Sequence, residues 1–135
     1  MVDRMLIFQN YSMEEKKDKN MAKIISIHEY ELKPGVDPAT FERAIKEAEK
    51  RGLFQMPGLI EYHFIKGIRG TRKGKYAAIW VYESLQAWEK LWGPIDAPHG
   101  KDRYPNNWKI WENEILAPLL DRDPDSITFS SYIEI

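Results

Sequence analysis

The chain has 135 residues and a mass of 15.9 kDa, and its 20 basic and 21 acidic side chains give a formal charge of −1. This length suits one domain and excludes a second independent core. The balanced charge excludes a general attraction for nucleic acid or for an anionic membrane. The absence of cysteine excludes disulfides, cysteine-ligated metal and thiol nucleophiles, and a cytoplasmic location is expected.

Residues 1–20 differ in pattern from the rest of the chain. They carry a short apolar cluster followed by a run of charges from Glu14 to Lys19. No apolar run is long enough to span a bilayer, and no signal peptide or membrane anchor is expected. Strong patterning begins only at Met21, so we predict an appendage over 1–20 and one domain over 21–135.

The domain opens with a predicted strand and helix. The β-branched and aromatic residues of 24–32 predict a strand, which stops before Pro34. Asp37 can cap a helix that has Pro38 in its first position and that Gly52 closes. Apolar side chains recur between these ends at helical spacing, which predicts that one side of this helix packs on a core.

Two further strands and a short helix follow. The segments 59–66 and 75–83 are predicted to be strands, joined by a loop rich in glycine and basic residues. That loop could cradle a phosphate through its backbone N–H groups, but a solvated hairpin loop is the simpler interpretation. Ser84 is in position to cap a short helix, which the Gly93 and Pro94 pair would end.

The last part of the chain predicts one more helix and one more strand. Asn106 or Asn107 could cap the helix, which would be kinked or broken near Pro118. The segment 127–135 is the last predicted strand. The resulting β-α-β-β-α-β order predicts an α+β, ferredoxin-like fold, an antiparallel sheet with helices on one face.

Alternation along these strands separates two sets of side chains. The aliphatic set is expected to pack against the helices: Ile25, Ile27, Ile60, Phe64, Ala77, Ile79, Val81, Ile127, Phe129 and Ile133. The aromatic and titratable set is expected on the open face: Ser26, His28, Tyr30, Glu61, His63, Ala78, Trp80, Tyr82, Ser130 and Tyr132. Such a face is too apolar to remain in water, which predicts a homodimer through the sheet face.

The order of elements, together with the segment from Ile79 to Trp88 and the later His99, resembles the dimeric α+β barrel superfamily. That superfamily includes antibiotic-biosynthesis-monooxygenase-like, muconolactone-isomerase-like, EthD-like and haem-degrading proteins. The resemblance covers roughly residues 23–135 and implies a dimer with a cavity for a small, often aromatic ligand. It also implies cofactor-independent oxygenation, isomerisation or a related proton transfer, and we predict no metal and no cofactor.

Eight residues are candidates for the site on the predicted open face and its rim. His28, with an ordinary pKa near ~6.5, is the candidate acid or base, and Tyr82 and Tyr132 are its candidate hydrogen-bond partners. The predicted catalytic set is His28, Tyr82 and His99, and the predicted ligand-binding set is Tyr30, Glu61, His63, Trp80 and Tyr132. The alternative is a non-catalytic homodimer in which the same side chains only seal an interface.

Three other functions compete with this interpretation. The haem-degrading branch of the superfamily has an Asn, a Trp and a His where this chain has His28, Tyr82 and His99, so two of the three identities differ. His28, Glu61 and His63 could form a two-histidine, one-carboxylate metal set, although Trp80 stands between their strands. The segment 73–82 faintly resembles the basic and aromatic signature of RNA-recognition motifs, whose exposed sheet aromatics stack on bases.

Overall fold

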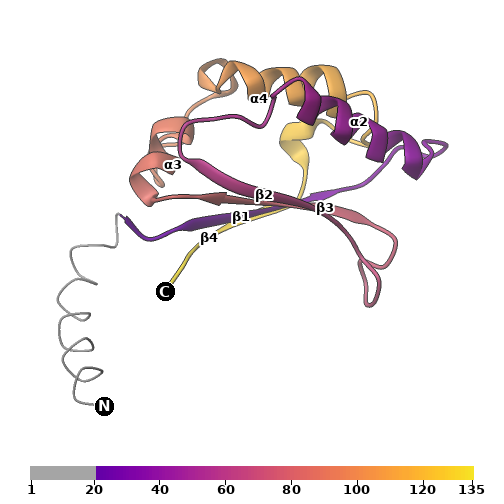
Figure 1. Ribbon diagram of the computed structural model, residues 1–135, viewed down its shortest axis with the longest axis horizontal. Coiled ribbons are helices and arrows are strands. Elements are labelled where there is room, and N and C mark those ends of the chain that lie inside the picture. The colour runs from indigo at the N-terminus through magenta and orange to yellow at the C-terminus, as the bar shows by residue number, and fades with distance from the viewer. Residues whose placement is uncertain (1–20) are drawn as a thin grey trace, which may run out of the picture.

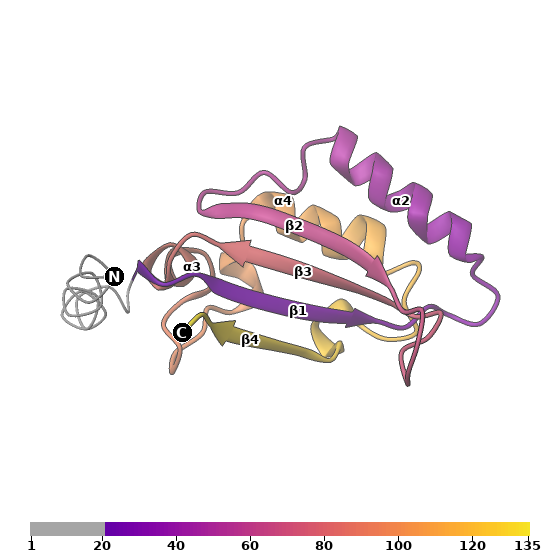
Figure 2. The same cartoon turned by 60° about the horizontal axis from the view of Figure 1, so that its bottom comes forward.

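The computed structural model describes residues 21–135, so the predicted appendage over 1–20 lies outside the described residues. One antiparallel sheet has the strand order β2-β3-β1-β4, and the helices cover one of its faces (Figures 1 and 2). The elements are β1 (Ile24–Tyr30), α2 (Pro38–Lys50), β2 (Leu59–Lys66), β3 (Tyr76–Tyr82), α3 (Leu85–Trp92), α4 (Asn106–Ile110) and β4 (Phe129–Ile133). The predicted α+β, ferredoxin-like fold is confirmed.

Helix α2 forms where the sequence predicts it. The Asp37 side chain accepts a hydrogen bond of 2.9 Å from the Ala39 N–H, and Pro38 occupies the first helical position. Phe41, Ile45 and Ala48 are the residues that it buries. The local capping signals and the apolar spacing therefore agree with each other, which is why this helix is predictable from sequence.

The later helices follow the prediction less closely. Ser84 caps α3 as predicted, accepting a 3.0 Å hydrogen bond from the Ala87 N–H. Neither Asn106 nor Asn107 caps α4 as predicted, because both lie inside the helix and its cap position is taken by Pro105, which has no side chain to accept a hydrogen bond. The Asn107 amide instead donates to the Gln55 carbonyl at 2.9 Å. Beyond α4 the chain continues as a π-helical segment, Trp111–Leu116, which the sequence did not predict. Wide turns of this kind are rare and occur often at functional sites.

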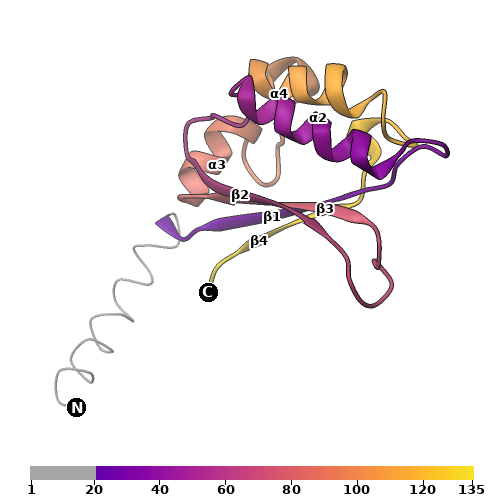
Figure 3. The same cartoon turned by 45° about the vertical axis from the view of Figure 1, so that its right-hand side comes forward.

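The predicted last strand is shorter than expected. A 3₁₀ turn, Pro124–Ser126, precedes it, and β4 begins at Phe129 rather than at residue 127. β4 pairs with β1 at one edge of the sheet, whereas β2 forms the opposite edge. The connection between β2 and β3 projects beyond the sheet on the side away from the helices (Figures 1 and 3).

The two faces of the sheet are assigned by the register and by the contacts of each side chain. On the central pair of strands, Ser26 lies opposite Trp80, and Ile27 lies opposite Ile79. Directly opposed residues share a face. Trp80 is fully buried and its ring centroid lies 5.0 Å from that of Trp108, so the Trp80 side of the sheet is the one that the helices cover.

The prediction for the two central strands is therefore wrong. The helices cover Ser26, His28, Tyr30, Ala78, Trp80 and Tyr82, and the open face carries Ile25, Ile27, Ala77, Ile79 and Val81. On the edge strands, the prediction that Glu61, His63, Ser130 and Tyr132 lie on the open face agrees with the register. Phe64, Phe129 and Ile133 lie on the helix-covered side as expected, whereas Ile60, next to a β-bulge, is half exposed.

The physical reason for the reversal is the aromatic character of the core. The helices and their connections supply large rings such as Phe41, Phe54 and Trp111, which pack against Tyr30, Phe64 and Trp80 from the sheet. Rings of this size leave gaps that are best filled by other rings, in tilted and edge-to-face pairs.

Among residues 21–135, none of the helices has the length and apolar character that a membrane span requires.

Candidate functional site

A cavity of about 510 Å³ lies between the helix-covered face of the sheet and the chain from α3 to β4. Its walls are contributed by Ser26, His28, Tyr82, Trp88, Trp92, Ile95, Pro98, His99, Tyr104, Trp108, Glu112, Leu116, Pro124, Asp125, Ile127, Phe129 and Ser131. The three residues predicted to be catalytic, His28, Tyr82 and His99, all line it. The structure thus brings them together, but on the face of the sheet opposite to the one that we predicted.

His28 comes from the middle of β1 and is enclosed by aromatic rings. Its ring centroid lies 5.9 Å from that of Trp80, 5.7 Å from that of Trp108 and 5.8 Å from that of Phe129. Its Nδ1 atom is buried, with no hydrogen-bond partner among residues 21–135. Burial lowers the pKa of His28 to about 4, because the charged imidazolium loses its hydration. The side chain is therefore a neutral imidazole near pH 7.

His99 is held by the loop that follows α3. The backbone N–H of His99 donates a 2.7 Å hydrogen bond to the backbone carbonyl of Trp92. Gly93 has a φ of +91° and lies against the imidazole, and a Cβ placed on it would come 2.7 Å from His99 Cδ2. The Nδ1 atom of His99 is also buried without a partner in the described chain. The loop therefore fixes the position of the ring in the cavity wall, with one buried nitrogen that the described chain does not hydrogen-bond.

Glu112 is a cavity residue that our sequence reasoning missed. Burial raises its pKa to about 7, with a smaller contribution from Asp123, while Lys101 and the Trp108 indole oppose the rise. Glu112 stands four residues after Trp108, so the helix predicted for this segment places the two side chains on the same side. A carboxyl with this pKa can hold or release a proton near neutral pH.

The remaining polar groups of the wall come from the sheet. Burial raises the pKa of Tyr82, so its phenol stays protonated and can donate a hydrogen bond. Across β1 and β4, the hydroxyls of Ser26 and Ser131 bond each other at 2.7 Å. The cavity therefore combines an apolar aromatic wall with a few polar groups, which is the usual make-up of a small-molecule site.

The other predicted ligand-binding residues do not line this cavity. Trp80 is buried behind His28, and Tyr30 is buried against Phe41 in the core. Glu61 and His63 are exposed on the open face, where their Oε2 and Nε2 atoms lie 3.0 Å apart. Tyr132 is 56% exposed on edge strand β4 and belongs to the open face. The eight predicted residues therefore divide between the cavity wall, the core and the opposite surface.

The same geometry removes the metal alternative. His28 lies on the helix-covered face of the sheet, whereas Glu61 and His63 lie on the open face. The backbone of the sheet separates them, so they cannot ligate one ion. Within residues 21–135, no group of three His, Cys, Asp or Glu side chains is placed to hold a metal ion.

The features that suggested RNA binding do not form a binding surface in the structure. Trp80 and Tyr82 are almost completely buried, so they are not a stacking platform. In the basic loop, Arg72 bonds the Glu31 carboxylate, lies 3.2 Å from a Glu29 oxygen and donates to the Tyr76 carbonyl at 2.6 Å. These bonds hold the hairpin against β1 and neutralise part of its charge, which favours the structural interpretation of this loop.

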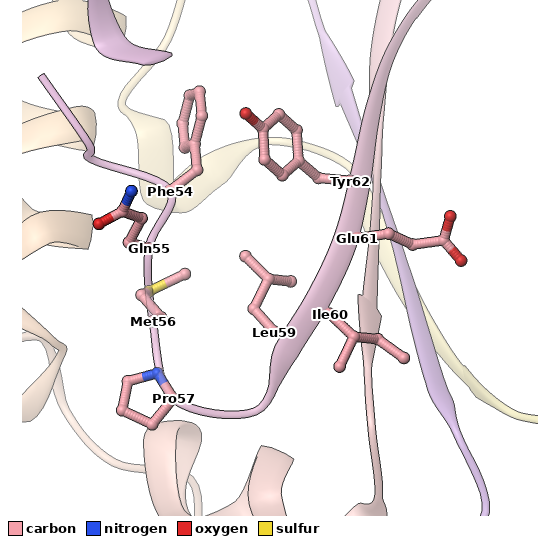
Figure 4. Close-up of a pocket in the computed structure, with 8 residues that line it drawn as sticks. All are labelled: Phe54, Gln55, Met56, Pro57, Leu59, Ile60, Glu61 and Tyr62. Carbon is pink, nitrogen blue, oxygen red and sulfur yellow. The ribbon is translucent and has the colours of Figure 1, made fainter. Parts of the chain in front are cut away.

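A second hollow, of about 620 Å³, lies beside edge strand β2 (Figure 4) and is more open than the aromatic cavity. Phe54, Met56, Leu59 and Tyr62 give it apolar walls, and the rings of Phe54 and Tyr62 lie 4.9 Å apart. The Glu61 carboxylate, its only acidic group, points away from this hollow in Figure 4. It offers no group for acid or base chemistry, so the aromatic cavity is the candidate site.

The architecture defines the class of protein as a ferredoxin-like α+β fold of the kind found in antibiotic-biosynthesis-monooxygenase-like and DABB proteins. A Bordetella bronchiseptica protein described as an antibiotic biosynthesis monooxygenase superposes with a TM-score of 0.58 at 14% identity, over 84% of this chain and 98% of its own. A DABB family protein from Mesorhizobium loti superposes with a TM-score of 0.57 at 11% identity, over 84% of this chain and 98% of its own. The hydroxynitrile lyase of Passiflora edulis superposes with a TM-score of 0.57 at 11% sequence identity, over 85% of this chain and 95% of its own.

No protein-family model and no curated protein matches the sequence. The resemblance stated from the sequence is therefore confirmed by structural similarity, at the level of the fold. Identities this low leave the chemistry of the site to be argued from its own residues.

The cavity does not fit haem, the cofactor of one branch of that superfamily. A haem presents two propionate carboxylates, which proteins commonly bind with basic side chains. Among the described residues that line this cavity, none is Lys or Arg, and two, Glu112 and Asp125, are acidic. Lys101 pairs with Asp125, whereas Glu112 has no basic side chain within 4.0 Å among the described residues and would repel a propionate, so we derive no step through haem.

Proposed function

We propose that the aromatic cavity binds a small apolar or aromatic compound and catalyses proton transfer on it. The observation that carries the proposal is a pair of histidines, His28 and His99, whose buried Nδ1 atoms have no partner in the described chain and whose side chains line the same cavity. Unpartnered polar atoms in a cavity wall are costly unless a ligand or water completes them. Among the cavities of the described chain, this one brings titratable side chains together on an aromatic wall.

His28 is the proposed base of this reaction. In the bound complex the His28 imidazole takes a proton from a carbon next to a substrate carbonyl, and the electron pair of the broken C–H bond moves into the carbonyl to give an enolate. The negative charge of the enolate stabilises the imidazolium, which burial alone disfavours. In a substrate whose enolate is extended by a C=C bond, His99 or Glu112 delivers a proton to the far carbon of the dienolate while His28 keeps the first proton, which completes an isomerisation. Tyr82 donates a hydrogen bond to the enolate oxygen. If dioxygen rather than a proton meets the enolate, the same first step leads to oxygenation without a cofactor.

The test is the exchange of substrate protons with deuterated solvent. 2-Tetralone, a bicyclic ketone with acidic C–H groups, serves as the probe, and NMR follows the loss of its α-proton signal near neutral pH. We expect wild-type protein to accelerate exchange and His28→Gln to lose at least about tenfold of that acceleration. His63→Gln, on the exposed opposite face, is the matched control and should keep it. Equal acceleration by His28→Gln and wild type would remove His28 from the mechanism.

The open face of the sheet supports a second, structural role. Ile25 and Ile27 on β1 continue into Ile79 and Val81 on β3 as one aliphatic stripe, while Glu61, His63 and Tyr132 lie towards its edges. An apolar centre with a polar rim is the anatomy of an interface between subunits. We propose that a second copy of this chain covers this stripe, through aliphatic rather than the aromatic residues predicted from the sequence.

Light scattering at micromolar concentrations, with and without 0.5 M salt, tests the dimer. We expect a mass near twice 15.9 kDa that resists salt, because apolar contacts are not screened. Ile79→Lys should give a monomer with an unchanged circular dichroism spectrum. Ile68→Lys is the matched control, since Ile68 lies in the exposed hairpin loop outside the stripe. A wild-type monomer at 100 μM would contradict the proposal.

A further inference from the structure

The charges of the aromatic cavity are uneven. Its described wall contains two carboxylates, Glu112 and Asp125, and no Lys or Arg. Lys101 neutralises Asp125 from outside the wall, with its Nζ 2.6 Å from Asp125 Oδ2. Glu112 has no ion-pair partner within 4.0 Å among residues 21–135. Lys101, at longer range, and the Trp108 indole stabilise the Glu112 charge in part. The wall therefore offers one carboxylate that no Lys or Arg of the described chain contacts directly.

The surroundings of Glu112 are rich in ring faces. Trp92 lies 5.3 Å from Trp108 and 5.5 Å from Tyr104 between ring centroids, and all three line the cavity with Glu112. The face of an indole or phenol ring carries partial negative charge and attracts cations, most strongly where water is excluded. Both kinds of group in this wall therefore favour positive charge.

His28 does not reverse this preference. His28 is neutral near pH 7, because burial lowers its pKa, so it supplies no positive charge for an anionic ligand. An anion would meet Glu112 and the ring faces without a counter-charge, whereas a cation would compensate both. Burying an unpaired charge is expensive, so the sign of the ligand charge should decide binding.

We propose that the ligand of this cavity is a compact aromatic molecule with one positive charge, such as an aryl-alkyl amine. Its cationic group lies beside the Glu112 carboxylate, and its ring packs against Trp92 and Trp108. The inference rests on the proposed function, because it names the chemical class of the compound that the cavity binds.

Three probes with the same ring separate charge from size. They are 2-(1-naphthyl)ethylamine, 2-(1-naphthyl)ethanol and 1-naphthylacetate, which are cationic, neutral and anionic at pH 7.5. Isothermal calorimetry measures their affinity, and the NMR signals of the tryptophan indole N–H groups report where they bind. We expect the amine to bind at least about tenfold more tightly than the alcohol, and the acetate most weakly.

Two variants test whether Glu112 is responsible. Glu112→Gln should remove most of the preference for the amine and leave the affinity for the alcohol nearly unchanged. Glu114→Gln is the matched control, since Glu114 is exposed on the same π-helical segment and contacts Arg51 instead. Thermal unfolding of both variants checks that the fold survives.

The outcomes distinguish this inference from the proposed function. Equal binding of amine and alcohol, or an amine preference that survives Glu112→Gln, would overturn the cationic ligand and leave a small-molecule cavity in place. If none of the three probes binds and 2-tetralone exchange is also not accelerated, the proposed function itself fails, and the cationic ligand fails with it.

Discussion

The two faces of the sheet solve different physical problems. The helix-covered face is built from rings, with Trp80, Tyr82 and Tyr30 almost fully buried, and it encloses a cavity that holds titratable side chains. The open face is built from aliphatic side chains such as Ile27 and Ile79, which remain partly exposed. Aromatic residues line the cavity on the covered face, whereas small branched side chains make a flat surface suited to another subunit.

The largest expected effect comes from removing an aromatic ring from the helix-covered face of the sheet. Trp80→Ala should lower the free energy of unfolding by about 3–5 kcal/mol, since it removes a fully buried ring from contact with several others. Ile79→Ala, one residue away on the open face, should cost about 1 kcal/mol in a dilute sample and more as concentration favours a dimer. Urea unfolding at two protein concentrations measures the loss of unfolding free energy in both variants. Equal losses would contradict a buried core on one face and an exposed subunit surface on the other.

A smaller effect is expected where the loop after α3 meets the cavity. Gly93 has φ +91° and ψ 168°, a conformation suited to glycine, and a Cβ there would also collide with His99. Gly93→Ala should therefore cost about 2–4 kcal/mol and weaken binding in the cavity. Gly70→Ala, in the hairpin beyond the open face, has a similar φ of +89° but open space, and should cost only about 1 kcal/mol. Equal losses in thermal unfolding and affinity would show that the contact with His99 is irrelevant.

The smallest expected effect is a dependence of stability on pH, which arises from the side chains of His28 and Glu112 in the cavity. The pKa of His28 is lowered from 6.5 to about 4, so between these values the unfolded chain binds more protons and stability falls as pH falls. The pKa of Glu112 is raised from 4.5 to about 7, so over that range the folded chain binds more protons and stability falls as pH rises. The two effects oppose each other between pH 4.5 and 6.5.

Single variants separate these opposing contributions. Relative to wild type, Glu112→Gln should gain stability as pH rises from 4.5 to 7, and His28→Gln should gain it as pH falls from 6.5 to 4. Each change should be at most about 3 kcal/mol, measured by urea unfolding at several pH values. If both variants follow the wild-type curve in parallel, neither side chain is buried as the structure describes.

Much of the fold could be predicted because its signals are local. Asp37, Pro38 and Ser84 act within a few residues of their own helices, and strand composition located the four strands to within a few residues. The π-helical segment Trp111–Leu116 could not be predicted, because its wide turn has no capping signal and satisfies long-range packing instead.

The candidate site was only half predictable. His28, Tyr82 and His99 were selected from the resemblance and from their chemistry, and they do line one cavity. Glu112 was missed because it stands among tryptophans that read as packing residues, and Glu61 and His63 were included although they lie on the other face. Spacing shows which residues of a strand share a face, but not which face a helix will cover.

The sequence by itself determined the order of strands and helices, the caps of α2 and α3, and the division of each strand into two alternating sets. Those features depend on neighbouring residues and on the period of each element. Only the tertiary structure decided that the rings go inward and the aliphatic side chains outward. That choice depends on the fit between Trp80 on the sheet and Trp108 and Trp111 on a segment far along the chain, which no local pattern encodes.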